Sequence, residues 1–168
     1  MEHRLILMRH ARSEWQDPGQ TDHSRPLTPD GRLAAESIAH SIAKLGWSPD
    51  HIACSDARRT RETADCMAPL FPTPPSINQH HTLYSHGRDT LWEVAATWSP
   101  SLTTILVLGH NPDMQLLISD LCGRSIQMTT ATAALLFARK TGNWAELLLH
   151  PTGAWEMVKI LRPPVITP

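Results

Sequence analysis

The sequence predicts an α/β fold, in which a single three-layer sandwich holds a mostly parallel central sheet with helices on both faces. Short apolar runs typical of buried strands alternate with longer segments whose apolar residues recur at helical spacing. A length of 168 residues suits one hydrophobic core. We therefore expect one domain over residues 1–162 and an irregular, proline-containing tail over 163–168.

The first half of the chain supplies the first strands and helices. Residues 5–8 are a continuous apolar run, as expected of a strand buried on both faces. Thr28 and Pro29 have the residue types that favour an N-cap and a first helical position, and Gly46 suits the end of that helix. Its predicted apolar stripe consists of Ala34, Ile38, Ile42 and Leu45. Residues 51–54 predict a second strand, and residues 56–70 a helix that the following prolines stop.

The second half continues this alternation and ends rich in strands. We expect a weak strand at 76–78, a helix over 89–98, a strong strand at 104–108 and a helix over 112–121. Three further short strands are predicted at 133–138, 145–149 and 155–160, separated by glycines.

Charge and cysteine content limit the possible partners and compartment. A formal net charge of −1 gives no broad basic field for nucleic acid or an anionic membrane, so we expect neither partner. The cysteines, an odd number without Cys-x-x-Cys spacing, argue against a disulfide framework and fit a reducing, cytoplasmic location. The apolar run before Arg9 is too short for a signal peptide or a membrane span.

The ten histidines raise the question of a metal site. His80, His81 and His86 lie close together, but adjacent histidines on an extended segment point to opposite faces. No His-x-x-x-His or acidic pattern accompanies them. We therefore predict no metal site and no cofactor.

Charged residues follow three of the predicted strands directly. Arg9 and His10 come after the first strand, Ser55 and a group of arginines after the second, and His110 after the strand at 104–108. Because the carboxyl ends of parallel strands share one edge of a sheet, these loops should meet there. Guanidinium groups suit the oxygens of a phosphoryl group in transfer, and an imidazole nitrogen can attack phosphorus. Arg9 and Arg59 therefore fit phosphate ligands, and His10 fits a nucleophile.

The same residues lie in motifs of a known family. The stretch LILMRHAR at 5–12 resembles the Arg-His-Gly signature of the histidine phosphatase superfamily, which includes phosphoglycerate mutases and SixA-type phosphohistidine phosphatases. Further matches lie at 24–31, 55–64 and 109–112, in the expected order. The Arg-Pro-Leu-Thr stretch and the short chain look most like the SixA branch. The resemblance implies a phosphoglycerate mutase-like fold.

The resemblance also implies roles for individual residues. Arg9 and Arg59 would bind the phosphate, His10 would be the nucleophile and His110 would donate to the phosphate. Arg25 would be an additional phosphate or substrate contact. Two further candidates for substrate contact are Arg12, which is equally compatible with a surface position, and Asn111, which follows His110. One departure from the signature is Ala11 in place of glycine, which is harmless if its φ stays negative and its methyl group does not crowd the phosphate.

The general acid is the least defined part of the prediction. Asp89 is the nearest candidate, with Glu93 behind it, but the sequence around Asp89 favours a helix N-cap over a catalytic role. A phosphohistidine substrate needs less help from an acid, because imidazole leaves more readily than an alkoxide. We therefore predict a SixA-type phosphohistidine phosphatase. The alternatives are a general phosphomonoesterase acting on small molecules and a phosphate-binding regulatory module with slow turnover.

Overall fold

A computed structural model describes residues 1–165 of the chain. Its six strands form one sheet in the order β3-β2-β4-β1-β5-β6. The strands are β1 (Arg4–Arg9), β2 (His51–Ser55), β3 (Ser76–His80), β4 (Thr104–Gly109), β5 (Ala133–Ala138) and β6 (Trp155–Leu161). The first four strands pair in parallel, whereas β5 runs antiparallel to β1 and β6 antiparallel to β5. The prediction of a mostly parallel central sheet is confirmed.

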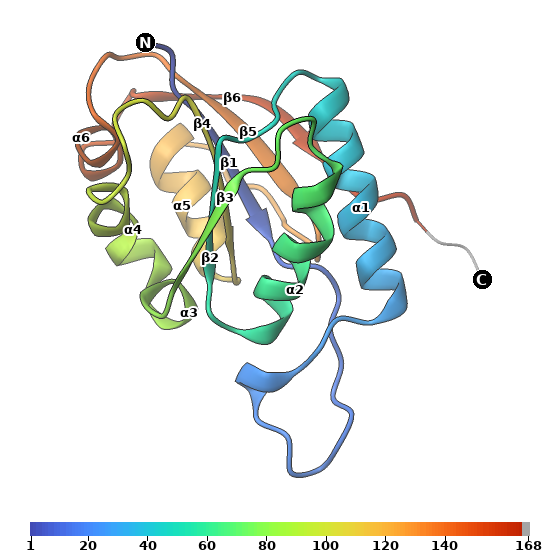
Figure 1. The fold of residues 1–168 in the computed structure, drawn as a ribbon. Helices are drawn as coiled ribbons and strands as arrows, with labels where there is room; N and C mark the ends of the chain where they lie inside the picture. The colour runs from blue at the N-terminus through green and yellow to red at the C-terminus, as the bar shows by residue number, and fades with distance from the viewer. Residues whose placement is uncertain (166–168) are drawn as a thin grey trace.

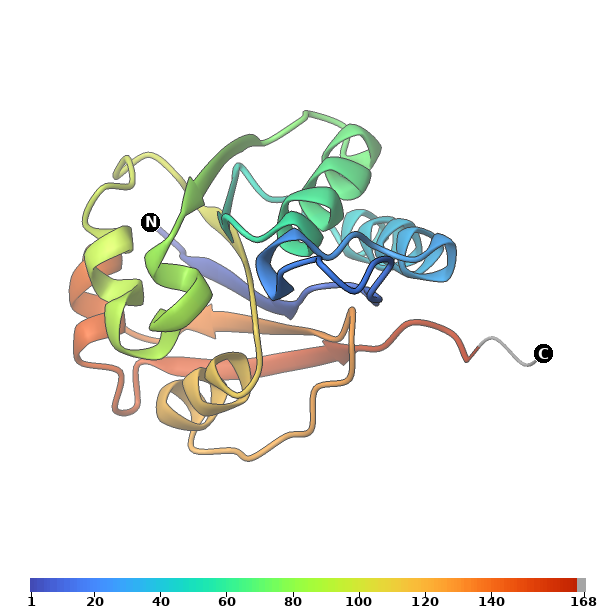
Figure 2. The ribbon, with the colours of Figure 1, turned by 90° about the horizontal axis from the view of Figure 1, so that it is seen from below.

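Helices cover both faces of this sheet (Figures 1 and 2). The helices are α1 (Pro29–Lys44), α2 (Arg58–Met67), α3 (Thr82–Ser85), α4 (Gly87–Ala95), α5 (Asp113–Cys122) and α6 (Trp144–Leu149), with short 3-10 helices η1 (Asp22–Ser24) and η2 (Ala68–Leu70). Alternate residues of β1 divide the core: Leu5 and Leu7 pack with α4, α5 and α6, whereas Ile6 and Met8 pack with α1 and α2.

The start of α1 confirms the predicted cap. The Thr28 side chain accepts a hydrogen bond from the Gly31 N–H at 2.9 Å, and Pro29 is the first helical residue. A Cβ atom on Gly31 would lie 2.3 Å from the Arg12 carbonyl oxygen, so only glycine lets the loop after β1 approach the helix this closely. The predicted stripe was partly wrong, because Leu45 is 41% exposed and the small residues Ala35 and Ala39 are buried instead.

Two local predictions were wrong, and one short helix was not predicted. Residues 145–149 form a helix, α6, rather than a strand. Asn143 and Glu146 form a capping box there, and this Asn-x-x-Glu pattern is readable in the sequence. Helix α3 was not predicted, and α4 begins at Gly87, so Asp89 lies in its first turn and His86 takes the N-cap position instead.

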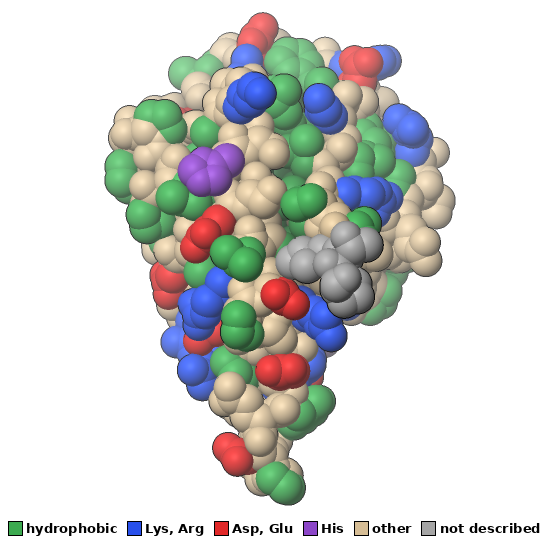
Figure 3. All heavy atoms as spheres, turned by 90° about the vertical axis from the view of Figure 1, so that its right-hand side faces the viewer, with side chains coloured by type: hydrophobic (Ala, Val, Ile, Leu, Met, Phe, Trp, Pro, Cys, Tyr) green, Lys and Arg blue, Asp and Glu red, His purple; other side chains and the backbone are tan. Residues whose placement is uncertain are grey.

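The molecular surface carries charges of both signs. On the face that includes α1, Lys and Arg side chains are interspersed with Asp and Glu, and the loop between β1 and α1 projects from one end (Figures 1 and 3). Among the described residues, no helix has the length and apolar character needed to cross a membrane. Residues 162–165 follow β6 without regular structure. The rest of the predicted tail, 166–168, lies outside the described residues, and the domain boundary at 162 stays a prediction.

Candidate active site

The carboxyl ends of β1, β2 and β4 meet at one edge of the sheet. Arg9, the last residue of β1, is in register with Gly109, the last residue of β4. The backbone N–H of His10 donates to the Gly109 carbonyl oxygen at 3.1 Å, which continues the pairing past the strand ends. The rings of His10 and His110 consequently lie with their centroids 5.2 Å apart. Two histidines that are 100 positions apart in the chain therefore face one small space.

His10 is held in a single orientation and protonation state. Its Nδ1 lies 2.7 Å from the Ala11 carbonyl oxygen, and Arg59 Nε donates to its Nε2 at 3.3 Å. A guanidinium nitrogen cannot accept a hydrogen bond, so Nε2 carries the lone pair and Nδ1–H donates to Ala11. Burial lowers the pKa of His10 to about 3, against the opposing effect of the bond to Ala11. The imidazole is therefore neutral at physiological pH, and its unprotonated Nε2 faces the arginine.

His110 is held in the opposite tautomer. Its Nδ1 accepts from Arg59 Nη2 at 3.2 Å, so its hydrogen is on Nε2, which donates to Ser55 Oγ at 2.7 Å. Ser55 in turn lies 3.0 Å from Thr60 Oγ1, whose hydroxyl has backbone carbonyls within reach. Burial, and then the charge of Arg59, lower the pKa of His110 to about 4. The ring is locked in place by β2 and α2 and presents Nδ1 to the same space as His10.

Arg59 is the centre of the cluster. It lies in the first turn of α2 and is only 5% exposed. Besides the two histidines, it donates through Nη1 to the Asp22 carbonyl oxygen at 2.7 Å and through Nη2 to Asp22 Oδ2 at 3.1 Å. Every nitrogen of its guanidinium group therefore donates a hydrogen bond within this cluster.

Asp22 and Tyr84 belong to this cluster, although neither was predicted. Asp22 Oδ1 accepts from Arg25 Nη2 at 2.8 Å, and its Oδ2 accepts from the Tyr84 hydroxyl at 2.7 Å as well as from Arg59. Partial burial raises the pKa of the Asp22 carboxyl, but the hydrogen bonds from Tyr84 and Arg59 outweigh that effect and hold the pKa at about 2. The Tyr84 ring packs edge-on against His110, with centroids 5.4 Å apart. Asp22 thus sets the positions of two arginines as an ionised carboxylate.

The other predicted residues lie at different distances from this centre. Arg9 is half-buried, donates through Nη1 to the Met128 carbonyl oxygen at 3.1 Å, and keeps a buried Nε without a partner. Arg25 forms an ion pair with Asp22. Arg12 is exposed. Asn111 donates to the Met128 carbonyl oxygen at 2.8 Å, and this bond stabilises the loop before β5.

Asp89 is not brought to the cluster. It lines a surface depression between α4, α5 and α6, together with Arg88, Trp92 and Asp120. Among the described residues, it forms no hydrogen bond or ion pair with any group around His10. In the described part of the chain, Glu93, one turn later on α4, forms no hydrogen bond or ion pair with the histidines either. Ala11 meets the backbone condition for replacing glycine, because Ala131 is the only non-glycine residue with positive φ in residues 1–165. That its methyl group leaves room for a phosphate stays a prediction.

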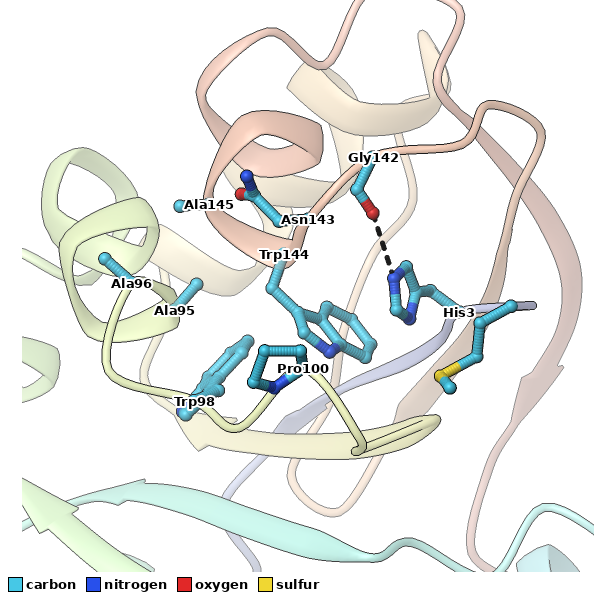
Figure 4. A pocket seen from close by; sticks show the side chains of 10 residues that line it. His3, Ala95, Ala96, Trp98, Pro100, Gly142, Asn143, Trp144 and Ala145 are labelled. Atoms are coloured by element: carbon cyan, nitrogen blue, oxygen red, sulfur yellow. Dashed lines mark hydrogen bonds between the residues drawn. The ribbon is translucent and has the colours of Figure 1, made fainter.

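Another cavity, of about 500 Å³, is lined by residues that precede β1 and β4, so it lies near the amino ends of these strands. Figure 4 shows its lining side chains. His3, which precedes β1, lines it together with Trp98, Pro100 and Trp144. His3 Nε2 is bound to the Gly142 carbonyl oxygen at 3.1 Å, and no arginine lines the space. This cavity therefore lacks the charged groups that a phosphoryl group requires.

Comparison with known proteins agrees with this geometry. The family model for the histidine phosphatase superfamily (branch 1) matches residues 5–80, which include Arg9, His10, Arg25 and Arg59. An uncharacterized chloroplastic protein of Arabidopsis thaliana is 37% identical over 95% of this chain and 78% of its own length. The chain belongs to the histidine phosphatase superfamily.

Among solved structures, SixA proteins have a fold similar to that of this chain. A putative phosphohistidine phosphatase SixA from Nakamurella is 27% identical, with a TM-score of 0.80 over 98% of both chains. A putative SixA from Agrobacterium tumefaciens is 26% identical, with a TM-score of 0.79 over 96% of this chain and 98% of its own. Family and neighbours support a phosphatase, and the fold is that of the phosphoglycerate mutase-like SixA structures. The cytoplasmic location stays a prediction.

Proposed function

We propose that this chain is a phosphohistidine phosphatase that transfers the phosphoryl group to His10 Nε2 and then to water. The observation that carries the proposal is the state of His10: a neutral imidazole whose Nε2 lone pair faces a buried arginine beside a second histidine. A nucleophile needs an unprotonated nitrogen, and the charge that develops on phosphorus needs fixed donors. Both requirements are met in one space.

In the first step, His10 Nε2 attacks phosphorus, and the bond between phosphorus and the substrate nitrogen breaks. The leaving imidazole takes the bonding electron pair and a proton from solvent. The Arg59 Nε–H, which donates to His10 Nε2 in the free protein, passes to an equatorial oxygen and so releases the attacking lone pair. Arg9, whose Nε lacks a partner, donates to another equatorial oxygen. The Nδ1–H of His10 keeps its bond to Ala11, which orients the ring throughout.

In the second step, water attacks phosphorus and the bond to His10 Nε2 breaks. His10 regains its lone pair, and the water proton leaves with the inorganic phosphate or passes to solvent. His110 Nδ1 faces the phosphoryl site, and a bound dianion would favour protonation of this ring, so that it becomes a donor. Protein-bound phosphohistidine is the proposed substrate, with small phosphomonoesters as the alternative.

The acid–base state of the cluster favours phosphohistidine over an alkyl ester. Asp22 is the carboxylate that contacts Arg59, and its pKa of about 2 keeps it ionised, so it holds no proton for a leaving alkoxide. Asp89 lies in a different depression. A substrate whose leaving group is imidazole needs no strong acid from the protein.

The test is a panel of substrates: a phosphohistidine protein, a phosphoserine peptide and an aryl phosphate. Wild type, His10→Ala and the matched control His40→Ala, an exposed histidine of α1, are assayed on each. We expect the highest kcat/KM on phosphohistidine, no turnover for His10→Ala and unchanged turnover for His40→Ala. Equal turnover on the serine and aryl esters would favour the general phosphomonoesterase. Phosphate binding without turnover on any substrate would favour the regulatory module.

A further inference from the structure

Two histidines and an aspartate come together at the rim of the catalytic cluster. His23 lies in η1, Asp56 directly follows β2, and His81 lies between β3 and α3. His23 Nε2 is 2.9 Å from Asp56 Oδ1, and His81 Nδ1 is 2.8 Å from Asp56 Oδ2. One ligand atom from each residue lies within 4.8 Å of the other two. The sequence did not predict this group, because its members are 33 and 25 positions apart.

These rim residues are separate from the catalytic histidines. The Tyr84 ring lies between the two sets, with its centroid 5.0 Å from that of His23 and 5.4 Å from that of His110. Among the described residues, the rim side chains form no hydrogen bond with His10, Arg59 or His110. The rim side chains are 39%, 29% and 72% exposed for His23, Asp56 and His81, so an ion from solvent can reach them.

The donor set indicates which ion would bind. Two imidazole nitrogens and one carboxylate oxygen are a common protein ligand set for zinc, with the fourth position left to water. Calcium and magnesium prefer sets made of oxygen. Tetrahedral zinc with ligands at about 2.0–2.1 Å places neighbouring donor atoms about 3.3 Å apart. The two imidazole nitrogens contact different oxygens of Asp56, Oδ1 at 2.9 Å and Oδ2 at 2.8 Å. The side chains must therefore move to bring both nitrogens and one carboxylate oxygen around a single ion, and their exposure leaves room for that movement.

We propose that His23, Asp56 and His81 form a zinc-binding site at the rim of the active site. Binding needs the hydrogen on each facing ring nitrogen to move to the other nitrogen of the same ring, which a neutral imidazole allows. The proposal does not depend on the phosphatase activity, because the metal takes no part in the phosphoryl transfer described above.

Occupancy of the site would join three segments that carry catalytic residues. His23 follows Asp22, which accepts two hydrogen bonds from Arg59, and Asp56 follows Ser55, which holds His110. His81 precedes Tyr84 by one turn. Bound zinc would therefore stabilise the folded rim against local opening, in addition to stabilising the whole chain by mass action.

The test is calorimetric titration of zinc into the full chain after treatment with a chelator, together with thermal unfolding with and without zinc. We expect one zinc per chain and a higher Tm when zinc is present. His81→Ala and His23→Ala should weaken binding by more than about tenfold, since each removes one of three ligands. Asp56→Asn, which keeps the shape but loses the charge, should also weaken it. His40→Ala, an exposed histidine elsewhere, should bind like wild type.

Two results would overturn the proposal. One is the absence of saturable zinc binding. The other is binding that survives in His81→Ala and His23→Ala but is lost in His10→Ala, which would place the ion between the catalytic histidines. Turnover of the chelator-treated protein is measured separately and should be retained. If that turnover were lost while the calorimetric titration still showed zinc binding, the result would count against the proposed phosphatase mechanism but not against the zinc site.

Discussion

Replacing Arg59 by lysine tests the centre of the catalytic cluster while keeping its charge. Arg59 uses three nitrogens to contact His10, His110 and Asp22 at once. A lysine ammonium is a single point at the end of a flexible chain, so it cannot reproduce this set of directions. The substitution leaves the buried rings of His10 and His110 without their partner.

The expected magnitude follows from those contacts. Loss of one well-placed donor to a developing oxyanion costs about 10²–10³-fold in kcat, or about 2.7–4 kcal/mol. His10 and His110 are 6% and 8% exposed, so a ring nitrogen that loses Arg59 stays buried and unsatisfied, and each such group destabilises the fold by about 1–3 kcal/mol. We therefore expect kcat/KM to fall by at least about 10²-fold and the free energy of unfolding to fall measurably.

The assay is kcat/KM on a phosphohistidine protein and on an aryl phosphate, with urea unfolding of the same samples. Arg58→Lys is the matched control, because Arg58 is the neighbouring residue on α2, its side chain is 45% exposed, and it pairs with Glu62 one turn away. A lysine retains that pair, so the control should behave like wild type. If Arg59→Lys turned over normally while folded, Arg59 would not be a phosphate ligand.

Three other perturbations test the surrounding chemistry. Vanadate and tungstate should inhibit competitively, because both mimic the phosphoryl group in transfer, and indifference to both would exclude a phosphoryl pocket. Asp89→Asn should leave turnover unchanged on both phosphohistidine and aryl phosphate, and a selective loss on the aryl phosphate would restore Asp89 as proton donor. The pKa values of His10 and His110, about 3 and about 4, lie below the ordinary value of 6.5. Between each lowered pKa and 6.5, the unfolded chain therefore binds more protons than the folded chain. The free energy of unfolding should therefore decrease as pH falls through that window, by up to about 1.4 kcal/mol per pH unit for each histidine. His110→Gln should reduce this slope, and an unchanged slope would show that the folded chain does not lower the pKa of His110.

The sequence was sufficient to locate the residues at the strand ends. His10, Arg59 and His110 follow or adjoin apolar runs, and the parallel order of those strands forces their loops to one edge. Asp22 could not be placed in this way, since its partners Arg59 and Tyr84 are 37 and 62 positions away. Such contacts depend on how the loop after β1 folds back, and no local pattern encodes that path.

The main error in secondary structure has a different cause. Residues 145–149 are a short apolar run, and periodicity alone does not separate a buried strand from a buried helix of that length. The capping box of Asn143 and Glu146 decides for the helix. The prediction of Asp89 as an N-cap was wrong because α4 begins two residues earlier, at Gly87.

The most direct test of the proposed mechanism is the site of the covalent phosphoenzyme. Rapid quench with a labelled substrate should trap an acid-labile, base-stable phosphoramidate, and peptide mapping should place the label on His10. His10→Ala should lose both label and turnover, whereas His110→Ala should still form the label, more slowly, because it removes a donor and leaves the nucleophile. Label on His110, or normal turnover with no phosphoenzyme, would contradict the mechanism.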